Sequence, residues 1–79
     1  MKYVYILQST ADPERHYTGV TSDLKARLAK HNVGDVPHTS KYAPWRISTY
    51  VAFVDEVRAH AFEKYLKSSS GRAFARKRL

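Results

Sequence analysis

Residues 2–20, KYVYILQSTADPERHYTGV, set the architecture that the rest of the chain completes. Aromatic and β-branched side chains dominate residues 2–8, which is typical of a strand. A polar turn with a proline follows at 12–15, and residues 16–20 predict a second short strand, so the two strands form a hairpin. Gly19, near the end of the second strand, indicates either a bulge or a place where another group approaches the backbone closely.

A helix is predicted directly after this hairpin, and Thr21 and Ser22 are suitable N-caps for it. Its apolar stripe follows helical spacing through Leu24, Leu28 and His31. Residues 35–44 contain two prolines and predict a loop with room for one helical turn. Residues 47–54 carry apolar groups on both faces and predict a third strand, which we expect at the centre of the sheet.

A second long helix is predicted after Asp55, which can cap it. Its buried stripe is expected to comprise Val57, Ala61, Phe62, Tyr65 and Leu66. Residues 68–71, SSSG, break this helix, and residues 72–79 predict a short basic helix that packs through Phe74. The order β-β-α-β-α-α predicts an α/β (α+β) fold, with a small three-stranded, mostly antiparallel sheet flanked by helices.

The length of 79 residues predicts a single domain over 1–79. A domain of this size buries only about 60% of the surface of its unfolded chain, so the core is thin. No cysteine is present, which excludes disulfides and thiolate zinc sites. No stretch is long and apolar enough for a signal or membrane segment. We therefore expect no membrane partner and a location in the cytoplasm or at the nucleoid. A monomer is expected because the sequence shows no heptad pattern and no apolar edge strand.

Charge is the clearest signal in the composition. Fourteen Lys and Arg against seven Asp and Glu give a formal net charge of +7. The excess is concentrated after Glu63, where no acidic residue occurs. The basic residues of this segment are Lys64, Lys67, Arg72, Arg76, Lys77 and Arg78. Such clustering predicts a polyanionic partner, nucleic acid above all, although a solvated face that only maintains solubility has the same composition.

Five polar residues border the predicted apolar stripes and strands. Arg27 and His31 are four apart on the first helix, so they lie one turn above each other beside its buried stripe. Glu63 lies at the edge of the stripe of the second long helix. Tyr5 and Tyr17 share one face of the hairpin and are expected to lie across from each other. The two helices could thus bring a guanidinium, an imidazole and a carboxylate to a shared rim near two phenols.

Each residue also has an ordinary structural explanation. The two tyrosines could form a common cross-strand aromatic pair. Arg27 could pair with Asp23 and Glu63 with Lys67, because each pair is four residues apart on a helix surface. His31 lies near a helix C-terminus, where a partial positive charge is favourable without any further role.

Taken together, these residues resemble the GIY-YIG nuclease family. Its two signature tripeptides are similar to residues 3–5, Tyr-Val-Tyr, and 17–19, Tyr-Thr-Gly. Arg27 and Glu63 match the arginine and the metal-binding glutamate of the family, and the resemblance covers essentially the whole chain. The tail is similar to that of the short stand-alone bacterial members, which resemble the N-terminal nuclease domain of the excision-repair nuclease subunit. The chain departs from the pattern at the first glycine and central isoleucine of the tripeptides. It also lacks the asparagine after the glutamate and the separate DNA-binding domain of larger members.

The resemblance implies a metal-dependent endonuclease that hydrolyses nucleic-acid phosphodiesters, leaving a 3′-hydroxyl and a 5′-phosphate. The catalytic residues would be Tyr5, Tyr17, Arg27, His31 and Glu63. Glu63 would hold one Mg²⁺ or Mn²⁺ ion, which a single carboxylate and the substrate phosphate can bind. The guanidinium would stabilise the developing negative charge. One of the tyrosines would position or deprotonate the attacking water, and the histidine would help in that transfer or hold a tyrosine hydroxyl.

The substrate is expected to be DNA rather than RNA, chosen by structure and not by sequence, in DNA repair or processing. Phosphate contacts would come from Lys41, Arg46, Lys64, Lys67, Arg72, Arg76, Lys77 and Arg78. Trp45 and Tyr42 are candidates for stacking on a base, although a core position for Trp45 fits equally well. Two alternatives remain open at this point: a nucleic-acid-binding module that has lost catalysis, and an adaptor for an acidic protein.

Overall fold

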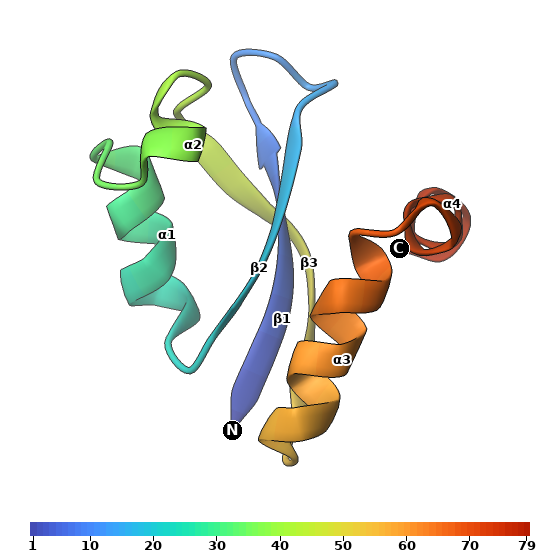
Figure 1. The fold of residues 1–79 in the computed structure, drawn as a ribbon. Helices are drawn as coiled ribbons and strands as arrows, with labels where there is room; N and C mark the ends of the chain where they lie inside the picture. Colours follow the sequence, from blue (N-terminus) through green and yellow to red (C-terminus); the bar gives the residue numbers. More distant parts are fainter.

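Three antiparallel strands form one sheet in the computed structural model, which describes residues 1–79 (Figure 1). They are β1 (Lys2–Ser9), β2 (His16–Thr21) and β3 (Trp45–Phe53), arranged in the order β2-β1-β3. β2 pairs with β1 across the predicted hairpin, and β3 pairs with the other side of β1. The predicted α+β fold with a three-stranded antiparallel sheet is confirmed.

The central strand is β1 and not the segment 47–54, so that prediction was wrong. Residues 4–7 of β1 are all buried, because helices cover both faces of this strand. Along β3 more and less exposed residues alternate, and Tyr50 is 53% exposed. Apolar residues on both faces therefore do not by themselves distinguish a central strand from an edge strand.

Helix α1 (Leu24–Asn32) follows the hairpin, but its N-cap is Asp23 and not Thr21 or Ser22. The carboxylate of Asp23 accepts a hydrogen bond from the amide of Ala26 at 3.1 Å. Thr21 is the last residue of β2, and its hydroxyl accepts from the amide of Asp23 at 3.1 Å. The threonine thus closes the turn that leads from the strand into the helix.

The remaining helices are α2 (Pro37–Ser40), α3 (Glu56–Leu66) and α4 (Ser69–Arg78). α2 is the single turn that the sequence allowed, and Asp55 caps α3 as predicted. α4 begins at residue 69 and not at 72, because the hydroxyl of Ser68 caps it by accepting from the amide of Gly71 at 3.1 Å. All four helices fall short of the length and hydropathy that a bilayer span requires.

The core consists of two clusters on opposite faces of the sheet, since side chains alternate along β1. Val4 and Ile6 pack on one face against α3. Tyr5 and Leu7 pack on the other face, together with Trp45 and α1. α1 and α3 accordingly lie on opposite sides of the sheet, as Figure 1 shows.

The buried side of α3 differs from the predicted stripe. Ala59 and Leu66 are buried and Phe62 is half-buried. The predicted members that are exposed are Val57, Ala61 and Tyr65. Alanine contributes little to a hydrophobic pattern, so the sequence did not indicate Ala59 as part of the buried stripe. Ala59 is nevertheless fully buried, and its small side chain lets α3 approach the sheet closely. Glu63, one turn after Ala59, therefore lies at the border of the buried side.

Helix α4 packs on the core through Ala75, while Phe74 is 36% exposed, so the predicted anchor was wrong. The ring of Phe74 instead lies 6.0 Å from that of Tyr65, between centroids. Gly71 is buried at the crossing, where a Cβ atom would lie 2.5 Å from the carbonyl carbon of Tyr65. The close approach of α4 to the end of α3 thus depends on this glycine.

Candidate active site

A buried chain of hydrogen bonds runs from β1 through α1 to α2. The Tyr5 hydroxyl lies 3.0 Å from Nε2 of His31, and Nδ1 of His31 lies 2.8 Å from Oγ1 of Thr39. The hydroxyl of Thr39 donates its proton to the carbonyl of Val36 at 3.3 Å. A threonine hydroxyl has only one proton, so it must accept from Nδ1–H. Nε2 is then the acceptor for the hydroxyl of Tyr5.

The pKa shifts in this chain keep both ring systems neutral. Burial, and then the charge of Arg27, lower the pKa of His31. Burial raises the pKa of Tyr5, and this outweighs the guanidinium of Arg27, which favours the phenolate. Because the two pKa values move apart, the shared proton stays on Tyr5 in the resting protein. His31, fully buried on α1, thus orients the phenol instead of carrying charge.

Gly19 makes room for the ring of Tyr5. The two residues are paired across β1 and β2, and a Cβ atom at Gly19 would lie 2.6 Å from Cζ of Tyr5 and closer still to its hydroxyl oxygen. The close approach predicted at this glycine is therefore present. The irregularity in the sheet lies elsewhere, between β1 and β3 at Ile6 and Leu7.

Tyr17 does not lie directly across from Tyr5, contrary to the prediction, because its partner in the register is Leu7. It is nevertheless on the same face of the sheet, with ring centroids 6.4 Å from Tyr5 and 4.9 Å from His31. The hydroxyl of Tyr17 makes no hydrogen bond within the chain. Two phenols thus flank one imidazole beside the β2 edge of the sheet, one fixed and one free to bind.

Arg27 on α1 lies beside the hydroxyl of Tyr5 and has no carboxylate partner. The predicted alternative pair with Asp23 is not formed, because that carboxylate caps α1. Nε of Arg27 is buried and has no hydrogen-bond partner. The interaction with Tyr5 raises the pKa of Arg27, which therefore stays protonated. A half-buried guanidinium with an unsatisfied N–H is poised for an anion.

Glu63 lies on α3, in the layer on the opposite face of the sheet from α1. Its side chain is 19% exposed, and its negative charge is one of the causes that raise the pKa of Tyr5. Oε2 of Glu63 lies 3.0 Å from Nζ of Lys67, so the predicted surface pair is present. The lysine side chain is 52% exposed. An ion pair between residues four apart on a helix stabilises a protein by only about 0.3–0.5 kcal/mol. A divalent ion can therefore readily replace Lys67 as the partner of this carboxylate.

The donor set suits magnesium better than a metal that needs several protein ligands. Glu63 contributes one carboxylate, and no group of three or more His, Cys, Asp or Glu side chains gathers anywhere in the chain. Mg²⁺ keeps several of its waters and is commonly bound through one or two carboxylates and the substrate phosphate. The residues present therefore fit an ion that binds together with its substrate.

Thr39 is the site residue that the sequence reasoning missed. It is 1% exposed, and its carbonyl accepts the indole N–H of Trp45 at 2.8 Å, which fixes α2 against β3. Trp45 is itself 5% exposed, so the stacking role suggested for it is excluded in favour of the core role. Nothing in the loop sequence marked Thr39, because its importance depends on a histidine eight residues earlier.

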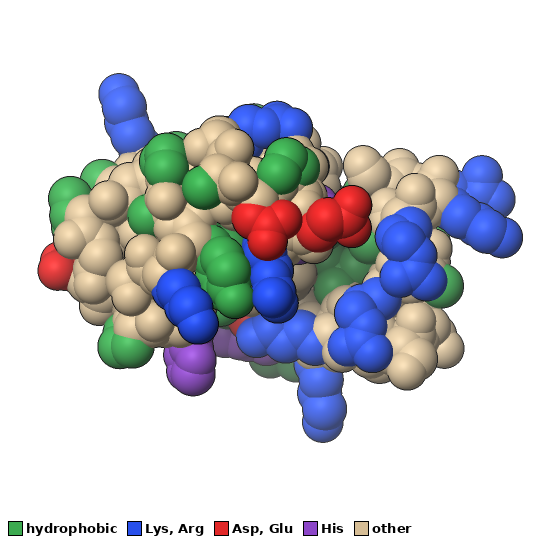
Figure 2. Space-filling view, turned by 90° about the horizontal axis from the view of Figure 1, so that it is seen from above, with side chains coloured by type: hydrophobic (Ala, Val, Ile, Leu, Met, Phe, Trp, Pro, Cys, Tyr) green, Lys and Arg blue, Asp and Glu red, His purple; other side chains and the backbone are tan.

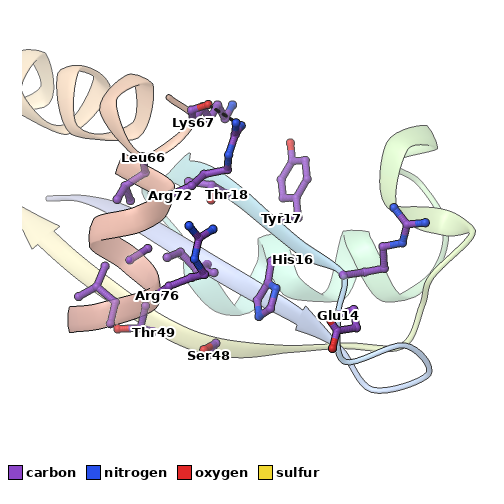
Figure 3. A pocket seen from close by; sticks show the side chains of 14 residues that line it. Glu14, His16, Tyr17, Thr18, Ser48, Thr49, Leu66, Lys67, Arg72 and Arg76 are labelled. Atoms are coloured by element: carbon purple, nitrogen blue, oxygen red, sulfur yellow. Dashed lines mark hydrogen bonds between the residues drawn. The ribbon is translucent and has the colours of Figure 1, made fainter. Parts of the chain in front are cut away.

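The predicted phosphate-binding residues are not all brought together. Lys67, Arg72 and Arg76 line a groove of about 750 Å³ between α4 and the sheet, which we call the α4 groove (Figure 3). Those that do not line it are Lys64, Lys77, Arg78, Lys41 and Arg46. Arg46 hydrogen-bonds to Gln8 between β3 and β1.

Two comparisons with known proteins found a match. A family model described as the GIY-YIG catalytic domain matches residues 1–78. A structure-specific endonuclease subunit SLX1 homologue from Giardia intestinalis is 35% identical over 65 residues. The match covers 77% of this chain and 18% of that relative, so the chain spans less than a fifth of its length.

Proposed function

The chain belongs to the GIY-YIG family of nuclease domains, and on that premise we propose that it is a divalent-metal-dependent endonuclease. One observation carries the proposal: Nε of Arg27 has no hydrogen-bond partner, and the charges of both Arg27 and Glu63 shift the pKa of Tyr5. A cation and a carboxylate that do not neutralise each other are suited to a phosphate and a metal ion, respectively.

Arg27 would bind the scissile phosphate. Its planar guanidinium donates in two directions and stays charged, so it can stabilise the negative charge that builds on the phosphate oxygens. The buried Nε–H then gains the acceptor that it lacks in the free protein. Because α1 holds the side chain beside Tyr5, the guanidinium needs little reorganisation when the substrate binds.

Tyr5 would accept a proton from the attacking water while its own proton passes to Nε2 of His31, 3.0 Å away. In the resting protein this transfer is unfavourable, since burial opposes charge on both groups. A bound phosphate adds negative charge nearby and favours the imidazolium. Tyr17, with its free hydroxyl, would orient the water for in-line attack. The new P–O bond forms as the P–O3′ bond breaks.

Glu63 would hold the metal ion through its carboxylate, releasing Lys67. An ion bound there would polarise the scissile phosphate and stabilise the leaving oxygen. The substrate class we propose is DNA, recognised by structure because phosphate contacts carry no direct sequence information. The name of the Giardia relative supports structure specificity. A role in DNA repair or processing is a further part of the proposal. A single monomeric domain in the cytoplasm likewise remains our proposal.

A nicking assay tests this function. Wild-type protein with Mg²⁺ or Mn²⁺ should cut plasmid, flap or single-stranded DNA, while Glu63→Gln and Arg27→Ala should bind but not cut. Glu63→Gln keeps the size of the side chain and removes its charge, so it is the sharper of the two variants. Cleavage at the wild-type rate by Glu63→Gln would remove the metal role assigned to this residue.

The second candidate function is a binding module without catalysis. The ion pair between Glu63 and Lys67 favours it, since it neutralises the one carboxylate available for a metal. In that case all three proteins would bind DNA equally and none would cut, at any concentration of Mg²⁺ or Mn²⁺.

A further inference from the structure

The α4 groove lies on the face of the sheet opposite to Tyr5. Ile6 of β1 and Thr49 of β3 contribute to its floor. Leu66 of α3 and Ala75 of α4 add further apolar side chains to it. Figure 3 shows Arg76 reaching from α4 over the strands towards His16. The groove thus combines a partly apolar floor with a charged wall.

The rim of the groove is strongly basic. Four basic side chains line it, and Glu14 is the acidic residue of the lining; the basic residues are Arg15, Lys67, Arg72 and Arg76. Arg15 is paired with Asp12 and Lys67 with Glu63. Arg72 and Arg76 pair with no carboxylate, and Arg72 is held in place because its Nη1 donates to the carbonyl of Lys67 at 3.1 Å. In Figure 2 Lys and Arg side chains gather over α4, beside a hollow with hydrophobic side chains at its bottom.

The groove is continuous with the candidate active site through two residues. Lys67 lines the groove and forms the ion pair with Glu63 at 3.0 Å. Tyr17 also lines it, while its ring lies 4.9 Å from that of His31. A chain of phosphates lying in the groove would therefore pass over the β2 edge at the place where the catalytic groups meet.

We propose that the α4 groove binds an unpaired nucleic-acid strand that leads to the scissile phosphate; this rests on the proposed nuclease function. A recessed apolar floor beneath a basic rim suits bases below and phosphates above, and single-strand binding sites likewise follow the backbone with a positively charged groove. Tyr17 is an aromatic residue of the lining on which a base can stack. The bases of a duplex are paired and cannot enter such a recess. The volume of about 750 Å³ is within the roughly 300–1,000 Å³ of small-ligand pockets and fits a short run of one strand.

The test compares two double variants of equal charge on the same helix. Arg72→Ala/Arg76→Ala removes the groove wall, and Lys77→Ala/Arg78→Ala removes two charges of α4 that do not line the groove. Binding of a fluorescent single-stranded oligonucleotide is measured by anisotropy in EDTA over a range of salt. The plot of log affinity against log salt has a negative slope, and its magnitude should decrease by about 1.4 for the groove variant. Each phosphate that the protein no longer neutralises reduces this magnitude by about 0.7. The other variant should show a clearly smaller decrease.

Equal decreases in both variants would mean that α4 acts only through its total charge and would overturn the proposal. So would an equal loss of binding to a duplex of the same sequence. A second pair of variants avoids the helix altogether: Ser48 is exposed and lines the groove on β3, so Ser48→Glu should weaken single-strand binding, whereas Ser48→Gln should not. Unchanged binding by Ser48→Glu would also contradict the proposal.

Binding in EDTA separates this inference from the proposed function. Loss of single-strand binding in the groove variant, together with a wild-type protein that never cuts, would support the groove and refute the nuclease. Unchanged binding in the groove variant, together with cleavage that depends on Glu63, would refute the groove and support the nuclease.

Discussion

Gly19→Ala should damage both the stability and the activity of this domain. The added Cβ atom would lie 2.6 Å from Cζ and 3.0 Å from Cε1 of Tyr5, inside the normal contact distance. The ring cannot swing away, because Tyr5 is 2% exposed and its hydroxyl is bound to His31 at 3.0 Å. The strand must therefore shift, or the hydroxyl must leave the imidazole.

Two effects of this substitution oppose each other. Overpacking of a core typically costs about 1–3 kcal/mol. Replacing a glycine within a strand lowers the entropy of the unfolded chain, a gain of about 0.5–1 kcal/mol. The clash involves both the ring and its hydroxyl, so we expect the cost of overpacking to exceed the entropic gain. The substitution should therefore lower the free energy of unfolding. For a domain of this size, each kcal/mol lost lowers Tm by about 4–8 °C.

Thermal melts and single-turnover cleavage should be measured on the same preparations. A displacement of Tyr5 by about 1 Å should slow cleavage by about 100-fold. In a Tyr5→Phe background Gly19→Ala should cost less stability, because the atom nearest to the new Cβ is then absent. Wild-type melting and cleavage in Gly19→Ala would refute the reasoning, as would an equal cost in both backgrounds.

Three further predictions concern the buried chain of hydrogen bonds. Thr39→Val should destabilise the domain by about 1–3 kcal/mol, because Nδ1–H of His31 loses its acceptor, while Thr39→Ser should recover most of this loss in urea titrations. Stability should fall as the pH drops below about 6.5, because His31 binds a proton in the unfolded chain, whereas its lowered pKa keeps it neutral in the folded protein. In His31→Gln, Tm should therefore depend less on pH in that range. Stability should also fall as the pH rises above about 10, because the unfolded chain loses the proton that Tyr5 retains, and Tyr5→Phe should weaken that dependence.

The elements of the fold were largely predictable because their signals are local. Neighbouring residues indicate the turn with Pro13 and the cap at Asp55. They also indicate a break between the last two helices, although it lies at residues 67–68 and not at 68–71. Errors arose where tertiary contacts decide. The strand order β2-β1-β3 depends on which strand the helices cover, and the buried side of α3 depends on Ala59, which a hydrophobic pattern hardly registers.

The candidate site was only partly predictable. Helical spacing placed Arg27 and His31 on one side of α1, and pairing in the hairpin placed the two tyrosines on one face. The hydrogen bond between Tyr5 and His31 joins residues 26 apart. Thr39 extends this chain of hydrogen bonds from α2, a segment that carries no motif in the sequence. The α4 groove was hidden for the same reason, since basic residues in a tail do not reveal which of them share a surface.

The convergence of Glu63 and Arg27 on one phosphate is the claim on which the proposed function depends. It is tested most directly by crystals grown with Mn²⁺ and an oligonucleotide that carries a non-hydrolysable phosphorothioate linkage. We expect one anomalous peak on the carboxylate of Glu63 and a phosphate oxygen within hydrogen-bond distance of Nε of Arg27. Manganese bound away from Glu63, or an Nε that stays unpartnered with the oligonucleotide in place, would contradict the proposed active site.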